Sequence, residues 1–461
     1  MNLQNTTFRK TLILAAAVIF MLFLPACRSY QKNSRGINDS FYKNDLSKTS
    51  NELAAQQKKS ANKKSTDLLK LEESISLMCQ GDFKRSTRLL CEVRDTFDDR
   101  DNQKFKSASE TALSMLTDDQ SISYRGEDHE KVLIRVMLAI NSLMTDGQDA
   151  VAYSHQINMK QEEIIHRGAG MSDPGAKTGN PKQSYRMLAI GPYITGIMWE
   201  ESMLERNEVA RAYTKVTQWA PGFLAGKQDL QRAQNGVHSQ RGNGAVYVIT
   251  LLGKGPNKVQ TSAPATQLSL LIADRIVSAT SKHSVPPTIA PVPIPEIKES
   301  VCRFQRVDVT ADRNPAYRVP TETITDINQI ARQQFEANRD WIIARAVARR
   351  VTKKAAVYGA KEATNTKSAA GEILLDVAGV IWEATEEADT RCWSLLPGKI
   401  QVARMELPAG EHEISLEPVS GGAGRGETYK KKVYVRDGRN TYVLAYIADD
   451  GLIGKVQSSC E

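Results

Sequence analysis

The stretch AVYVITLL, residues 245–252, marks the point at which this chain changes from a helical to a strand-like pattern. It is short and rich in β-branched side chains, and the turn-forming residues GKGPNK (253–258) follow it. Such a run ahead of a turn predicts a β-strand. Helical patterns lie before this strand, and strand and helix patterns alternate after it. The chain is therefore predicted to be an α+β protein.

Upstream of the strand, apolar side chains recur at helical spacing from residue 64 to residue 240. Short turns divide this region into pairs of helices, at Gly81-Asp82, Asp146-Gly147 and Glu205-Arg206-Asn207. A single helical pair cannot bury its apolar face alone, so neighbouring pairs must stack. We therefore predict a helical-repeat domain over residues 64–240.

The last of these units, residues 190–219, ends in Ala220-Pro221. Helix, turn, second helix and closing proline resemble a tetratricopeptide repeat (TPR). The resemblance implies a concave surface, lined by the stacked pairs, that binds another protein. The repeats are irregularly spaced, so a plain helical bundle is the alternative.

Two regions of different character follow. Residues 241–320 are predicted to be a mixed strand and extended region, with VCRFQRVDV (301–309) as a strand and PPTIAPVPIP (286–295) in a polyproline-like conformation. Residues 321–392 return to the helical period and predict a helical hairpin. Its second arm, AAGEILLDVAGVIWEA (369–384), is too short and too charged for a membrane span.

The C-terminal residues 393–461 alternate between apolar and polar side chains, and their turns include Pro408-Ala409-Gly410 and Asp437-Gly438. We predict a small β-sandwich of about four strands. Trp393 is expected to be buried where this module joins the hairpin, with Asp389 or Arg391 in an ion pair beside it.

The first 27 residues carry a targeting pattern. Arg9 and Lys10 precede the apolar run LILAAAVIFMLF (12–23), and residues 1–26 therefore predict a secretory signal peptide. Leu24-Pro25-Ala26-Cys27 resembles the bacterial lipobox, which implies that the Cys27 thiol carries a lipid anchor. The alternative is an ordinary secretory signal with a cysteine nearby by chance. The polar residues 27–63 are predicted to form a lipidated flexible tether.

Composition is that of a globular protein, with 41% apolar and 25% charged residues. The net charge is +8 for the whole chain, and removal of Arg9 and Lys10 with the signal leaves +6. This mild basicity fits an anionic neighbourhood without specifying one. Five further cysteines cannot all pair within one chain, and both free thiols and a Cys79–Cys91 disulfide remain open. They are Cys79, Cys91, Cys302, Cys392 and Cys460.

The sequence contains no nucleophile elbow, phosphate-binding loop, zinc-protease helix or EF-hand loop. We therefore expect no catalytic residue, no metal ligand, no cofactor and no enzymatic activity. We also expect neither a nucleic acid nor a small molecule as a partner.

One basic helix has binding potential. Arg345 and Arg349 lie four residues apart and share one helix face, which can meet lipid phosphate or an acidic protein. The alternative is a solvated face or internal ion pairs. The candidate residues for an anionic partner are Arg345, Arg349, Arg350, Lys353 and Lys354.

The order of these features, with EEADTRCWSLLP (386–397) and LPAGEH (407–412), resembles a poorly characterised family of bacterial periplasmic lipoproteins. The C-terminal strands are similar to PEGA-type β modules. Relatives are often encoded beside LpoB-type activators of penicillin-binding proteins, which implies an envelope protein as partner. Cys392 departs from the small polar residue expected at its position.

The expected function is that of a non-enzymatic scaffold or accessory factor, linked to peptidoglycan synthesis. The lipid on Cys27 would anchor it in the cell envelope, and Arg28, where an inner-membrane lipoprotein has Asp, favours the outer membrane facing the periplasm. The alternative is a membrane-active or transport component that uses the hairpin at residues 340–385.

Overall fold

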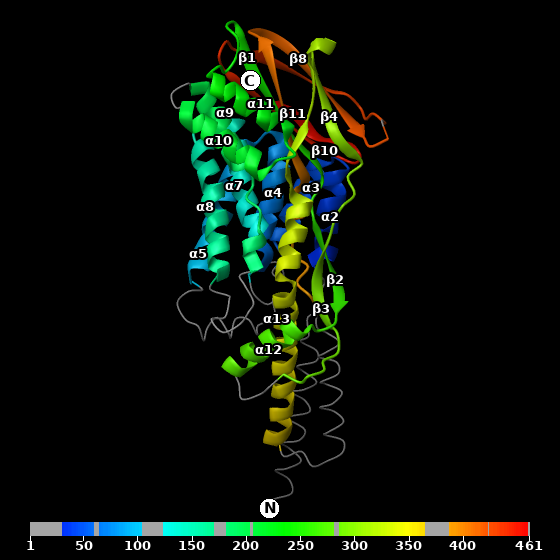
Figure 1. Cartoon of the computed structure of the whole chain (residues 1–461). Coiled ribbons are helices and arrows are strands. Elements are labelled where there is room, and N and C mark those ends of the chain that lie inside the picture. The colour runs from blue at the N-terminus through cyan, green and yellow to red at the C-terminus, as the bar shows by residue number, and fades with distance from the viewer. Residues whose placement is uncertain are drawn as a thin grey trace, which may run out of the picture.

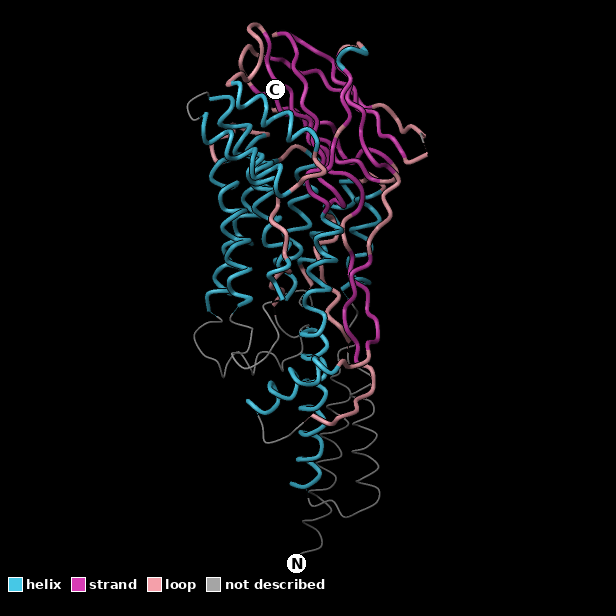
Figure 2. Tube along the Cα trace, in the orientation of Figure 1, coloured by secondary structure: helices cyan, strands magenta, loops and turns pink. Residues whose placement is uncertain are grey.

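A computed structural model describes residues 30–59, 64–103, 123–169, 181–202, 206–280, 285–364, 387–422 and 424–459. It confirms the α+β class: a layer of helices packs against β-sheets at one end of the molecule, and a narrower part projects from the other end (Figures 1 and 2).

The helical layer confirms the helical pattern upstream of residue 240. Helices that follow one another in the chain pack side by side, which is the arrangement expected of short connections. The layer consists of α2 (Tyr30–Tyr42), α3 (Leu46–Gln57), α4 (Thr66–Gln80), α5 (Phe83–Gln103), α7 (Asp128–Leu143), α8 (Ala150–Ala169), α9 (Ile190–Ser202), α10 (Arg206–Trp219) and α11 (Leu224–Asn235).

The strand predicted at residues 245–252 is the central strand of a five-stranded sheet. This strand, β1 (Asn243–Lys254), pairs parallel with β10 (Asn440–Ala448) and antiparallel with β7 (Pro397–Pro408). The sheet has the order β11-β10-β1-β7-β6, with β6 (Glu322–Asp326) and β11 (Gly451–Ser458) at its edges. Both faces of β1 are buried, which accounts for its nearly continuous apolar sequence.

A second sheet lies against the outer face of the first. It has the order β5-β4-β8-β9, formed by β5 (Arg318–Pro320), β4 (Phe304–Ala311), β8 (Gly410–Ser420) and β9 (Tyr429–Val435). Val246 and Val248 from β1 share one apolar core with Val307 and Val309 from β4. The predicted division at residue 393 is therefore wrong, because strands from both sides of it form the same two sheets.

The inner surface of the helical layer is covered by the protein's own sheet. Tyr247 and Leu251 of β1 and Tyr446 of β10 lie in the same core as side chains from α4, α7 and α9. The ring centroids of Phe41 and Tyr446 are 5.4 Å apart, edge to face. The expectation that this surface binds another protein is therefore wrong for the described structure, because the surface is already buried.

The predicted tether over residues 27–63 is also wrong where the structure describes it. Residues 30–57 form α2 and α3, and the side chains of Ile37, Phe41 and Leu53 are buried in the main core. Ile37 and Phe41 lie four residues apart on one face of α2, Leu53 lies on α3, and α3 packs against both α2 and α4. Cys27 itself lies outside the described residues.

The projecting part, here called the stalk, is built from the middle of the chain. It comprises the ribbon β2 (Asn257–Ala263) and β3 (Val292–Lys298), with α12 (Gln267–Thr280) and the long helix α13 (Ile327–Thr364). Its separate apolar core joins Ile276 and Val277 of α12 to Val347 of α13. In Figure 1, α13 continues past the ends of α5, α7 and α8.

The predicted hairpin over 321–392 is confirmed only in its first arm, α13, and the region opens with strand β6 rather than helix. The second arm, at 369–384, lies outside the described residues. The polyproline-like stretch ends in β3, where Pro293 and Pro295 alternate with apolar side chains on a strand whose one partner among the described strands is β2.

Replacing Gly454 with Ala is expected to destabilise the contact between β11 and α4. Gly454 has φ +72°, and an added Cβ would collide with the carbonyl oxygen of Cys79 at the end of α4. We expect a loss of about 2–4 kcal/mol in the free energy of unfolding, measured by urea denaturation. Gly438 is the control, because it has φ +69° with no atom within 4 Å of its added Cβ. Gly438→Ala should cost about 1–2 kcal/mol, and equal losses would contradict this account.

Candidate functional site

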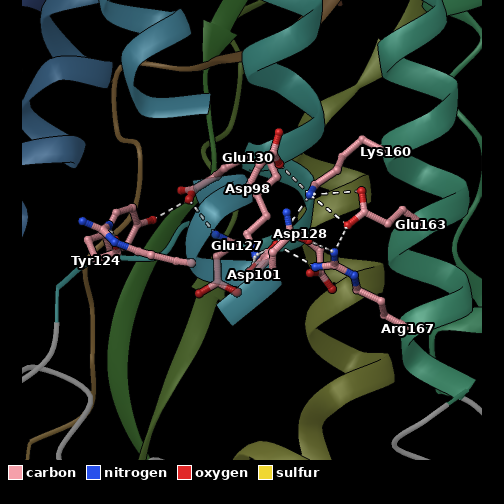
Figure 3. Close-up of polar contacts among 12 residues, drawn as sticks. Asp98, Asp101, Tyr124, Glu127, Asp128, Glu130, Lys160, Glu163 and Arg167 are labelled. Carbon is pink, nitrogen blue, oxygen red and sulfur yellow. Dashed lines mark hydrogen bonds and ion pairs between the residues drawn. The ribbon is translucent and has the colours of Figure 1, made fainter. Parts of the chain in front are cut away.

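A cluster of paired charges lies at the end of the helical layer from which the stalk projects. We call it the joint (Figure 3). Its carboxylates are Asp98, Asp101, Glu127, Asp128, Glu130 and Glu163, and its cations are Lys131, Arg135, Lys160, Arg167, Lys182 and Lys258. The two sets are equal in number, so the cluster neutralises its own charge.

Lys160 of α8 is at the centre of the joint. Its ammonium nitrogen lies 2.7 Å from Asp98 and 3.5 Å from Asp101, both on α5, and only 2% of its side chain is exposed. Lys131 of α7 donates to both carboxylate oxygens of Asp101 at 2.9 Å. Charges spaced three or four residues apart on each helix face the same neighbour, so three helices are tied together by one network.

The first turn of α7 ties the stalk to the helical layer. Glu127 accepts a hydrogen bond from Lys258 of β2, and Asp128 is 2.7 Å from Lys182. Asp128 also accepts from the hydroxyl of Tyr185 at 3.1 Å, and Asn338 of α13 donates to that hydroxyl. The stalk ribbon and the stalk helix are therefore both held by charges at one end of α7.

The pKa values of Glu127 and Lys258 show that the ion pair between the ribbon and α7 is strong. Burial alone would raise the pKa of Glu127, but the neighbouring Lys258 ammonium outweighs burial and lowers that pKa to about 2. Burial alone would lower the pKa of Lys258, but Glu127 raises it well above its usual range. This pair is therefore ionised throughout the physiological pH range.

An irregular stretch, residues 387–396, is held between the helical layer and the sheet. We call it the inner segment. Glu130 accepts from the amide of Trp393 at 2.7 Å. Glu72 of α4 accepts from the amides of Ser394 and Leu395 at 2.8 and 2.9 Å. The side-chain oxygens of two buried glutamates thus satisfy three consecutive backbone donors that have no strand partner in the described structure.

Other groups hold the opposite side of the inner segment. The amide of Gly255 donates to the carbonyl of Leu396 at 2.7 Å, and the hydroxyl of Tyr446 donates to the same carbonyl at 3.2 Å. Trp393 is fully buried, and Arg391 pairs with Asp389 at 2.7 Å. The expectation for Trp393 and its neighbouring ion pair is therefore confirmed.

Stability is expected to depend on the protonation of Glu72. Burial raises the pKa of this carboxyl from 4.5 to about 7, although its hydrogen bonds from Ser394 and Leu395 lower it. Between pH 4.5 and 7 the unfolded chain loses this proton while the folded chain keeps it. The stability that Glu72 contributes is therefore fully present below pH 4.5, and about 3 kcal/mol of it is lost as the pH rises to 7.

Glu72→Gln provides the measurement, because an amide does not titrate. The free energy of unfolding of both proteins is measured by urea denaturation from pH 4.5 to 7.5. As the pH rises over this range, the free energy of unfolding of the variant should increase by about 3 kcal/mol relative to that of the natural protein. A difference between the two proteins that does not depend on pH leaves this comparison unchanged. Parallel curves would show that Glu72 does not titrate in this interval.

Among the basic residues predicted to bind an anionic partner, the three whose side chains the structure describes do not form one exposed surface. Arg350 is buried and donates to the carbonyls of Ala290 and Pro291 at 2.9 and 3.0 Å. Arg345 and Arg349 are half-buried and also engaged in interactions. Lys353 and Lys354 lie on α13, but their side chains are outside the described part of the structure. The prediction that Arg350 belongs to a binding face is wrong, since it fastens α13 to the chain before β3.

The described cysteines are free thiols. Cys79 and Cys392 are buried, whereas Cys91 and Cys302 are partly exposed. The Cys79–Cys91 disulfide, one of the two alternatives, is therefore absent from the described residues. Cys460 lies outside them.

The sequence did give a signal for the joint that the periodicity analysis missed. Lys131 and Arg135 sit on either side of Val132-Leu133-Ile134, in a helix that is buried on all sides. A charged residue on a helix with no exposed face requires a buried partner. Glu72 interrupts the apolar face of α4 in the same way.

The described residues include no group of three or more side chains suited to holding a metal ion. Within the same ranges, no helix is both long enough and apolar enough to cross a bilayer. Comparisons with protein-family models, curated proteins and solved structures found no match for this chain.

Proposed function

We propose that this chain is a lipid-anchored, non-enzymatic scaffold or accessory factor of the bacterial envelope. The observation that carries the proposal is the joint, in which buried charges fix a projecting stalk to a rigid body. A neutralised network of this kind holds a shape, whereas a catalytic site keeps reactive groups open to a substrate. Leu24–Cys27 supply the anchor in this proposal, and the outer membrane facing the periplasm is the proposed location.

The partner in this proposal is an envelope protein, and the setting is peptidoglycan synthesis. In it, the helical layer is an irregular TPR-like array whose inner surface holds the chain's own inner segment. The C-terminal strands are PEGA-like in this proposal, and they share their two sheets with strands from earlier in the chain. The partner must then meet an outer surface of the body or the stalk.

Cys27→Ser is expected to abolish lipid attachment. Cells grown with radiolabelled palmitate should label the natural protein and not the variant, because only a thiol at this position takes up the lipid. Cys91→Ser is the matched control, since Cys91 is a partly exposed thiol elsewhere in the chain, and this variant should be labelled normally. Label retained by Cys27→Ser would overturn the anchor.

The same variant separates the scaffold from the alternative, a membrane-active component that uses the hairpin at 340–385. After extraction of membranes with carbonate, Cys27→Ser should appear in the soluble fraction if the lipid is the anchor. Retention in the membrane pellet would favour the membrane-active alternative. In vivo cross-linking of the lipidated chain should yield an adduct with a penicillin-binding protein or its activator, and its absence would argue against the peptidoglycan link.

A further inference from the structure

The body of the protein begins almost immediately after the proposed lipid. Only Arg28 and Ser29 separate Cys27 from Tyr30, the first residue of α2. Three residue steps of fully extended chain span at most about 11 Å. A lipid on Cys27 therefore keeps the first turn of α2 within about 11 Å of the bilayer surface.

The first turn of α2 points towards the stalk end of the molecule. The turn that follows α2 lies against the sheet, since the side chain of Asn44 accepts from the amide of Gly454 in β11 at 2.6 Å. Tyr30 is 12 residues from Tyr42, or about 18 Å along the helix axis. In Figure 1, α2 runs from the sheets towards the end from which the stalk projects.

The stalk extends at least as far from the body as the chain between α2 and Cys27 allows the lipid to extend. Asn38 of α2 is level with the inner segment, where its side chain bonds Ser394 at 2.8 Å. From there Tyr30 is about 12 Å away along the axis, and Cys27 at most about 11 Å further. On the stalk, α13 continues for 26 residues from Asn338 at the joint to Thr364, or about 39 Å. A bilayer that holds the lipid and lies across the end from which the stalk projects is therefore within reach of the stalk.

The stalk combines an exposed leucine with a net positive charge. Leu271 of α12 is 66% exposed, and Leu268 and Arg275 lie one turn to either side of it on the same helix face. In sequence, residues 339–364 of α13 contain seven Lys or Arg and two acidic residues, a net charge of +5, of which the buried Arg350 contributes to the charge of the stalk and not to its exposed surface. Apolar side chains combined with positive charge favour the headgroup region of anionic membranes.

We propose that the stalk contacts the same bilayer that holds the lipid on Cys27, with α12 as the contacting helix and anionic phospholipid as its partner. The inference rests on the proposed lipid anchor. Lipid and stalk then fix the protein at two points, and the sheet end is directed away from the membrane.

The test replaces the lipid by a tag, so that it does not depend on acylation. A hexahistidine tag in place of residues 1–27 tethers the otherwise complete chain to vesicles of phosphatidylglycerol, phosphatidylcholine and a nickel-chelating lipid. Hydrogen exchange of α12 is then compared between tethered and free protein. We expect the α12 amides to exchange about threefold or more slowly when tethered, with α9 to α11 unchanged.

The same chain tethered through a C-terminal tag is the control. The C-terminus lies at the sheet end, so the stalk is directed away from the vesicle and α12 should not be slowed (Figure 1). Leu271→Glu should remove the slowing in the N-terminally tethered chain. Leu224→Glu, at an exposed leucine of α11, should preserve it. Equal exchange of α12 in free and N-terminally tethered protein would overturn the stalk contact, whereas failure of palmitate labelling would overturn the anchor alone.

Discussion

Lys160→Met is expected to lower the free energy of unfolding by about 2–3 kcal/mol. The ammonium of Lys160 is 2.7 Å from Asp98 and 3.3 Å from Glu163, and its side chain is almost fully buried. Removing it takes away one of the cations that each of these carboxylates contacts, while Lys131, Arg135 and Arg167 remain paired with Asp101, Asp98 and Glu163. The loss is therefore that of charge-assisted hydrogen bonds made by a buried ammonium. Urea denaturation at neutral pH measures the change.

The matched control is Lys70→Met. Lys70 is 2.9 Å from Glu92, but 28% and 45% of the two side chains are exposed. An exposed pair of this kind contributes about 1 kcal/mol or less. The double variant Lys160→Met with Asp101→Asn should lose less than the sum of the two single changes, because each single change already removes the Lys160–Asp101 interaction. Similar small losses for Lys160→Met and Lys70→Met would show that the joint does not hold the body together.

Trp393→Ala is expected to cost about 3–5 kcal/mol of the free energy of unfolding. The side chain is fully buried between the helical layer and the sheet, so its loss leaves a cavity that surrounding groups cannot fill. Among the described residues, its indole nitrogen has no hydrogen-bond partner. Trp393→Phe should therefore cost much less, about 1.5 kcal/mol, because it loses volume without losing a hydrogen bond.

Trp219 provides the comparison for Trp393. It is only packed against the edge of the same core and is partly exposed, so Trp219→Ala should cost less than Trp393→Ala. If the two alanine variants were equally stable, the inner segment would be a dispensable part of the core. Thermal and urea denaturation of the four proteins give the ranking.

Local patterns predicted most of the individual elements. The helical spacing upstream of residue 240 corresponds to α4 through α11, and AVYVITLL lies within β1. Alternation in the C-terminal region predicted strands where β7 to β10 occur. Periodicity succeeds here because each of these elements buries one clear face or is buried throughout.

Long-range arrangement could not be predicted in the same way. Nothing local to Ala245 indicates that its parallel neighbour is Asn440. Residues 30–57 are polar on average, and three buried apolar side chains were too weak a signal against that background. The joint was missed because periodicity counts apolar positions and ignores a charge that finds a buried partner on another helix.

The position of β1 in its sheet has a consequence for biogenesis. Both of its neighbours, β7 and β10, come from residues after 396, so a nascent chain carries β1 for about 150 residues of further synthesis before either arrives. During that interval an apolar strand has two unpaired edges, which is a risk for aggregation. A chain that stops before residue 397 keeps that risk permanently, so truncation products should be cleared by proteases rather than accumulate as folded fragments.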